Sequence, residues 1–431
     1  MDKNLKTTPL NKWHISKGAN MADFGGFDMP LWYETGVKNE HLAVLKSAGI
    51  FDTSHMACIN VKGKDSFELL NYCFTREMKD LKKGQCIYGA FLDVNGHCMD
   101  DAIIYKFNDN FFMICINAGM GSAIAHHLDS NKTNNSDVNI EDLSGKIAKM
   151  DIQGKNCAII LAKLIKNPDI ILKKMPYFSF KGHFDKSQFD NSGSEKFNVQ
   201  LLDGTPILLS RSGYTGEFGF EIFIRSDAIV KLWEDILKEG DQFDITACGL
   251  AARDSLRTGA GLPLSHQDIG SWTFVNHPWE FALAYNHDKT GFTKNFLGAD
   301  ALLSDNNDSF IYPFVGDSLR KVTPGENTHV IDQTGKTIGK VLTCVTDMGI
   351  TWYNGKIISI NSQNIPEDLK IKGLSCGFIM VNEKFDISNN NHISLILKEK
   401  KRTIKVKIVK NIRPDRTARI KLKYPKGQKL T

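Results

Sequence analysis

The feature that most limits the fold of this chain is a change of character near residues 306–308. Before it, helix-like and strand-like patterns alternate. After it, and clearly beyond Pro324-Gly325, short strand-like segments are joined by turns, and no long helix is indicated. Helices mixed with strands, followed by a series of short strands, are typical of an α+β fold that ends in a small β-barrel.

Hydrophobic periodicity predicts the individual elements. A helix is expected from a Thr35 cap to about Ser47, and another from a Ser226 cap to Gly240. Two further helices are expected over 65–72 and 121–128. Strands are expected over 57–62, 101–105, 111–117, 148–151, 205–212, 219–224 and 403–408. The polar segment 181–198 is expected to be a surface loop or insertion.

Composition excludes several classes of protein. With 431 residues, 42% hydrophobic and 24% charged, the chain predicts two or three globular domains and no disordered or disulfide-stapled fold. The longest apolar runs, 111–116 and 157–162, fall far short of the roughly 18 residues of a membrane span. The polar N-terminus predicts no signal peptide. Nine cysteines without C-x-x-C spacing predict free thiols, no metal site and a cytoplasmic location.

Positive charge is concentrated at the C-terminus. Residues 398–431 carry a net charge of +12, so the rest of the chain carries −7. Such a tail suits nucleic acid, an anionic membrane or an acidic partner. However, residues 403–408 alternate strictly between lysine or threonine and an aliphatic side chain, which favours a half-buried strand with a solvated lysine face. We therefore expect no nucleic acid and no membrane as partners.

Two acidic residues follow a tight turn. Asn95-Gly96 is a hairpin dipeptide, and Asp100 and Asp101 begin the next strand. Adjacent strand residues face opposite ways, so only one of the two is expected to point inward. A carboxylate there can act as a general base or hold a cation, whereas the alternative is a turn with solvated acids.

Two further segments are unusual. Residues 210–221 hold three glycines in a strand-like run, which permits a bulged loop with close backbone approach to a ligand and leaves Glu221 either solvated or facing an internal channel. Arg253 and Arg257 are spaced i, i+4 on one expected helix, an arrangement that suits a carboxylate or phosphate, or a salt bridge to Asp254.

These segments resemble the glycine-cleavage T-protein (aminomethyltransferase) family. Its members typically show F-D-x-S-H-M, N-x-x-G-x-x-x-D-D, S-R-x-G-Y-T-G-E-x-G-F-E and G-L-x-A-R-D-x-L-R in this order. The counterparts here are 51–56, 93–101 with Asp93 in place of Asn, 210–221 and 249–257. The opening at 22–31 and the strand at 151–154 are similar to the family as well. The resemblance is strong over about residues 8–303.

The resemblance implies a three-domain clover-leaf around a central channel that binds tetrahydrofolate. Residues 1–303 would form two interleaved α+β subdomains, and residues 304–431 a β-barrel domain with the basic tail. By position in the motifs, Asp101 matches the catalytic carboxylate and Glu221 the residue that holds the pterin edge. The remaining folate-site positions match Met56, Tyr88, Asn117, Tyr177, Tyr214 and Arg253.

The implied reaction moves a one-carbon unit from an aminomethyl-lipoyl carrier protein to tetrahydrofolate and releases ammonia. The alternative is a folate-dependent methyltransferase or demethylase that uses a sulfonium, methylamine or methoxy donor. A folate-binding scaffold of iron–sulfur assembly is disfavoured, because no K-G-C-Y-x-G-Q-E-type signature occurs.

Four departures from the family pattern concern the donor. Gly259 stands where the family has an acid, Ser265-His266 replaces Tyr-Gly, residues 343–349 replace T-S-G-x-x-S-P, and Phe178 replaces the second tyrosine of a pair. We expect these changes to cluster where donor and carrier approach.

Overall fold

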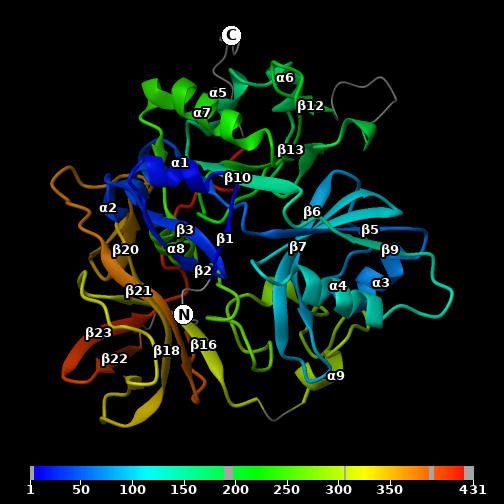
Figure 1. Ribbon diagram of the computed structural model, residues 1–431. Helices are drawn as coiled ribbons and strands as arrows, with labels where there is room; N and C mark the ends of the chain where they lie inside the picture. Colours follow the sequence, from blue (N-terminus) through cyan, green and yellow to red (C-terminus); the bar gives the residue numbers. More distant parts are fainter. Residues whose placement is uncertain (1–3, 189–197, 305–306, 388–392, 422–431) are drawn as a thin grey trace.

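The computed structural model describes residues 4–188, 198–304, 307–387 and 393–421. Figure 1 shows three lobes: a seven-stranded sheet with helices at the top, a five-stranded sheet at the right and a β-barrel at the lower left. The α+β class and the C-terminal barrel are therefore confirmed. Within the described ranges, no helix combines the length and apolar character needed to cross a bilayer.

The five-stranded sheet is antiparallel throughout and carries the candidate carboxylates. Its order is β6(Gln85–Leu92), β7(Cys98–Asn108), β8(Phe111–Ile116), β5(Ala57–Lys62) and β9(Asn139–Asp142). Helices α3(Ser66–Cys73) and α4(Gly121–Ser130) cover one face through a core that includes Leu70, Ile104 and Ile124. The opposite face, with Tyr105 and Met113, packs against the seven-stranded sheet.

The seven-stranded sheet is mixed. Its order is β11(Phe180–Gly182), β13(Pro206–Ser210), β14(Gly219–Arg225), β10(Ile147–Gln153), β4(Gly49–Asp52) and β15(Thr246–Ala247), with β12(Val199–Gln200) on β13. Its outer face packs on α5(Cys157–Ala162), α6(Pro168–Ile171) and α7(Ile229–Gly240). The buried side chains of α7, Ile229, Leu232, Trp233 and Ile236, recur at helical spacing, so burial of this stripe fixes the helix on the sheet.

A small three-stranded sheet and two helices border the centre. The sheet orders β1(Lys6–Thr7), β3(Phe27–Trp32) and β2(Asn20–Phe24), next to α1(Asn11–Ser16). Helix α2(Val37–Lys46) packs on α8(Leu250–Gly259). Short helical turns complete this part of the chain: η1(Lys186–Gln188), η2(Asp241–Phe243), η3(Glu280–Ala282) and α9(Ala299–Leu302).

The C-terminal barrel closes on itself. Its strands are β16(Phe310–Gly316), β21(Leu374–Val381), β18(Thr337–Asp347), β17(Thr328–Ile331), β22(Ser394–Glu399) and β23(Arg402–Ile408), with the hairpin β19(Ile350–Tyr353)–β20(Lys356–Ser359) beside them. In β23, Ile404, Val406 and Ile408 are buried while Lys405 is exposed, which confirms the predicted half-buried strand.

Two predicted helix caps are wrong. The residue that precedes α2 is Gly36 and not Thr35, and the one that precedes α7 is Ala228. The Ser226 hydroxyl instead donates to the Gly145 carbonyl, 3.0 Å away on a neighbouring segment. Both helices therefore start without a side-chain cap, and their burial in the core holds them. Part of the predicted 181–198 loop lies outside the described residues.

The segment after β23 returns to the centre of the molecule. Arg413 is fully buried, where its Nη1 lies 2.6 Å from Asp347 Oδ2 and its Nε lies 3.3 Å from Glu217 Oε1. The Ala418 amide donates to the Gly216 carbonyl, 3.0 Å away. One buried arginine thus joins the barrel to the glycine loop that precedes β14.

Candidate active site

The two acidic residues of β7 converge on one asparagine. The Nδ2 of Asn117, which follows β8, lies 2.8 Å from Asp100 Oδ1 and 2.6 Å from Asp101 Oδ1. The Tyr88 hydroxyl donates to Asp101 Oδ2 at 2.7 Å. The prediction that only one carboxylate would point inward is wrong, because Asn117 lies just past the strand end, where its amide reaches both faces. Asp100 is fully buried and Asp101 half-buried.

Burial makes both carboxyl groups unusually weak acids. It raises the pKa of Asp100 to about 6, although hydrogen bonds from Ser265 and Asn117 act in the opposite direction. Burial, followed by the nearby charge of Asp100, raises the pKa of Asp101 to about 7, against the bonds from Tyr88 and Asn117. Close buried carboxylates resist simultaneous ionisation, so this pair holds a proton near neutral pH.

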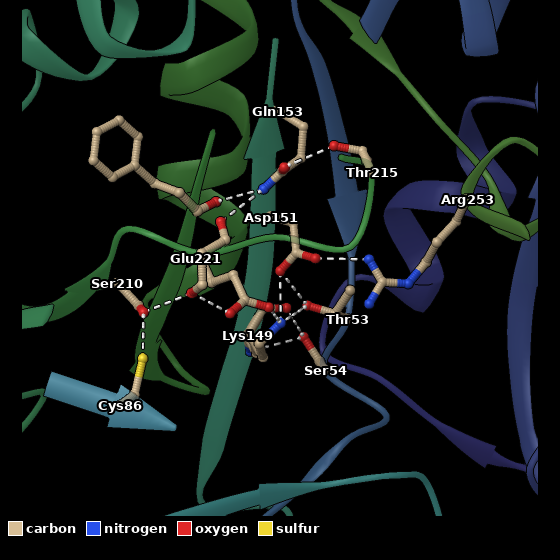
Figure 2. Close-up of polar contacts among 12 residues, drawn as sticks. Thr53, Ser54, Cys86, Lys149, Asp151, Gln153, Ser210, Thr215, Glu221 and Arg253 are labelled. Atoms are coloured by element: carbon tan, nitrogen blue, oxygen red, sulfur yellow. Dashed lines mark hydrogen bonds and ion pairs between the residues drawn. The ribbon is translucent and has the colours of Figure 1, made fainter. Parts of the chain in front are cut away.

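A second polar cluster surrounds Glu221 on β14 (Figure 2). Glu221 Oε1 lies 2.7 Å from Lys149 Nζ, and Oε2 accepts a 2.5 Å hydrogen bond from the Ser212 hydroxyl. Lys149 Nζ also lies 2.6 Å from Asp151 Oδ1, and Asp151 Oδ2 lies 2.7 Å from Arg253 Nη1. Glu221 is therefore buried and faces an interior network, which resolves the alternative left open by its strand position.

The charges of this network stabilise one another. Burial alone would lower the pKa of the Lys149 ammonium, but the carboxylates of Asp151 and Glu221 outweigh it, so that pKa lies above its usual value. Burial would likewise raise the pKa of Asp151, but Lys149 and Arg253 hold it below the usual range. Lys149 and Asp151 thus remain charged in the interior at neutral pH.

Lys149 and Asp151 were not identified as site residues from the sequence. The signal that could have found them is the alternation of Lys149, Asp151 and Gln153 with aliphatic residues along β10, in a strand buried on both faces. Gln153 also explains the glycine loop, because a Cβ at Gly213 or Gly219 would overlap its side-chain amide. The close approach that these glycines permit is to Gln153.

The remaining predicted site residues lie around these clusters. The Arg253 guanidinium stands 4.8 Å from the centre of the Tyr214 ring, and Arg419 stands 5.6 Å from that of Tyr177. The partly buried Met56 packs with Tyr105 in the core between the two sheets. Arg257 is not available to bind a carboxylate or phosphate beside Arg253, because its guanidinium pairs with Asp254 and Asp268.

Three of the four departures from the family pattern lie close together, because the Thr343 hydroxyl of the 343–349 segment donates to Asp268 in the loop of Ser265 and His266. A Cβ on Gly259 would overlap the Asp347 carboxylate and the Arg413 guanidinium, so Asp347 of the altered 343–349 segment fills the space of the missing acid. These two departures are buried and compensate each other. Ser265 and His266, by contrast, lie against Asp100: His266 Nε2 is 3.9 Å from Asp100 Oδ1.

Comparison with known proteins gives consistent matches. Residues 10–285 match the GCVT N-terminal domain. An aminomethyltransferase of Caldanaerobacter subterraneus subsp. tengcongensis is 36% identical over 315 residues, 73% of this chain and 77% of that protein. One of Koribacter versatilis is 33% identical over 348 residues, 79% of this chain and 84% of that protein.

A solved structure is similar over nearly the whole chain. The crystal structure of glycine cleavage system aminomethyltransferase T from Bartonella henselae matches with a TM-score of 0.74 and 25% identity. The match covers 96% of this chain and 99% of that one.

Proposed function

Because the chain belongs to the glycine-cleavage T-protein (aminomethyltransferase) family, we propose that it transfers a one-carbon unit from an aminomethyl-lipoyl carrier protein to tetrahydrofolate and releases ammonia. The observation that carries the proposal is the Asp101–Asn117–Tyr88 cluster, which holds a carboxyl group of pKa about 7 between a tyrosine hydroxyl and an asparagine amide. The similar proteins are named aminomethyltransferases, which does not favour the demethylase alternative.

The residues present fit a bound folate. A pterin ring is flat, aromatic and rich in N–H donors. Glu221 offers a buried carboxylate whose oxygens have capacity beyond the bonds to Lys149 and Ser212. Tyr177, Tyr214 and Met56 provide aromatic and sulfur surfaces nearby, which suit the faces of such a ring.

Each cluster then has a separate task. Glu221 would anchor the pterin edge, with Lys149 fixing the direction of its carboxylate. Arg253, held by Asp151, would orient Tyr214 from the face of its ring. Tetrahydrofolate supplies, when bound, the nitrogen atoms that accept the one-carbon unit. Asp101 would exchange a proton near the departing amine, since an acid of pKa close to neutral serves in both directions.

The family resemblance also bears on the domain division, the basic tail and the cellular location. The division at residues 303 and 304 separates the folate-binding region from the barrel domain, and the clover-leaf would surround a central channel. The basic tail would suit an acidic carrier or the glutamate chain of folate. A cytoplasmic location suits nine cysteines that are all buried and free.

The test is product analysis with purified protein. Incubation with tetrahydrofolate and an aminomethyl-lipoyl carrier should give methylene-tetrahydrofolate, dihydrolipoyl carrier and ammonia in equal amounts. A parallel incubation with a sulfonium, methylamine or methoxy donor should give no methyl-tetrahydrofolate. Product from a methyl donor, with none from the carrier, would refute the proposal.

A further inference from the structure

The loop that carries Ser265 and His266 closes the Asp100 side of the carboxylate pair. Asp268 holds this loop: its carboxylate accepts the Leu264 amide at 3.0 Å and the Thr343 hydroxyl at 2.6 Å, and it pairs with Arg257. His266 adopts a φ of +63°, which is uncommon for a residue other than glycine. The fold thus fixes this histidine in a specific place.

Asp100 and Asp101 accept hydrogen bonds from different sets of donors. Asp100 accepts hydrogen bonds from the backbone amide of Asn117 at 3.0 Å, from its Nδ2 at 2.8 Å and from Ser265, and the Nε2 of His266 lies nearby, 3.9 Å from Oδ1. Asp101 accepts the Tyr88 hydroxyl and the same Asn117 Nδ2. Donors and cations stabilise the ionised form of a carboxyl group, so the greater number around Asp100 favours its ionisation.

The other titratable groups around the pair are neutral at pH 7. Tyr88 from β6, Cys98 from β7 and Tyr214 from the glycine loop all face the pair, and burial raises the pKa of each. The remaining neighbour, on the solvent side, is His266, whose side chain is 54% exposed.

We propose that Ser265 and His266 are positioning residues that fix the negative charge of the pair on Asp100, so that Asp101 is the carboxyl group that carries the transferable proton. The pKa values of about 6 for Asp100 and about 7 for Asp101 have the same order. The transfer of that proton to a departing amine rests on the proposed function. The assignment of the proton to Asp101 does not.

The first experiment locates the proton without catalysis. In the full-length chain labelled with 13C-aspartate, infrared difference spectra across a pH titration should show carboxyl groups that ionise near neutral pH. Asp101→Asn should remove the group of higher midpoint, and Asp100→Asn should leave a single group whose midpoint is lowered, because the charge of Asp100 no longer raises the pKa of Asp101. His266→Gln and Ser265→Ala should each move the lower midpoint upward by about half to one pH unit, because Asp100 loses a neighbouring imidazole or a hydrogen-bond donor.

A matched histidine serves as the control. His97 Nδ1 lies 3.6 Å from Asp93 Oδ2 at an exposed turn of the same sheet, so His97→Gln should leave both midpoints in place. The pH profile of kcat should shift in the same direction as the infrared midpoint in the His266 and Ser265 variants. Unchanged midpoints in both variants would overturn the proposal, as would a carboxyl signal at the higher midpoint that survives Asp101→Asn.

The two proposals fail separately. Absence of aminomethyl transfer by the wild-type protein would refute the proposed function and leave the infrared titration interpretable. An active enzyme whose His266→Gln and Ser265→Ala variants keep the wild-type infrared midpoints would refute the positioning role alone.

Discussion

Removing the charge of Glu221 tests the interior network most directly. Glu221→Gln keeps the shape of the side chain but leaves Lys149 and Arg253, two buried cations, to share the Asp151 carboxylate. Breaking one partner of a buried ion pair costs about 3–5 kcal/mol. Because the glutamine oxygen still accepts a bond from Lys149, we expect a loss of about 3 kcal/mol in the free energy of unfolding.

The double variant separates stability from binding. Lys149→Met alone should also destabilise the protein, since it leaves Glu221 buried without its cation at 2.7 Å. In Lys149→Met/Glu221→Gln both charges are gone, so the loss should be smaller than the sum by about 1.5–3 kcal/mol. Urea unfolding of the wild-type protein and the three variants at pH 7 measures this coupling.

The variants should rank differently in their affinity for tetrahydrofolate than in their stability. Loss of a charge-assisted hydrogen bond to the pterin edge costs about 1.5–3 kcal/mol, or roughly 10- to 150-fold in Kd. Calorimetric titration should show that loss for Glu221→Gln and for the double variant alike, although the two variants differ in stability. A double variant that binds tetrahydrofolate as tightly as the wild type would refute the anchor role, and a coupling near zero would refute the ion pair.

Three further predictions address other parts of the structure. Asp101→Asn should lower kcat by about 10²- to 10⁴-fold while the Kd for tetrahydrofolate measured by calorimetry changes little; unchanged turnover would exclude the catalytic assignment. Gly259→Glu should destabilise by several kcal/mol in urea unfolding, and adding Asp347→Ala should recover most of the loss, because the two acids occupy one space beside Arg413; no recovery would contradict that compensation. The cationic partners of Asp151 and Asp347 lower the pKa values of these two carboxyl groups. Their contribution to stability is therefore complete above the ordinary aspartate pKa of about 4 and is lost as pH falls below it. Unfolding curves between about pH 7 and 2.5 should show this decline, and the decline should be shallower in Asp347→Asn.

The sequence predicted what depends on local pattern. The alternation of 403–408 predicted β23, and the aliphatic stripe of 229–237 predicted α7. The prediction that Ser226 caps α7 was wrong because its hydroxyl donates instead to the Gly145 carbonyl, 81 residues away in the sequence. A local pattern contains no information about such a neighbour.

The family resemblance pointed to Asp101 together with its partners Tyr88 and Asn117, and to Glu221 but not to its partner Lys149. Lys149 pairs with Glu221 across 72 residues, and a lysine inside a strand gives no sign of its partner before the sheet order is known. The same holds for Gly259 and Asp347, whose compensation depends on the return of residue 413 to the centre. Candidate site residues can be named from the motifs, whereas the ion pairs that hold them in place depend on long-range packing.

The burial of Arg413 has a consequence for synthesis on the ribosome. Its partners Glu217 and Asp347 are made earlier, and at about 5–20 residues per second roughly 10–40 s separate Glu217 from Arg413. During that interval the nascent chain carries two acidic side chains whose buried positions are unfavourable without the arginine. The lobes therefore cannot complete their mutual packing until residue 413 has been added, so a chain interrupted before it should stay open to proteases and chaperones.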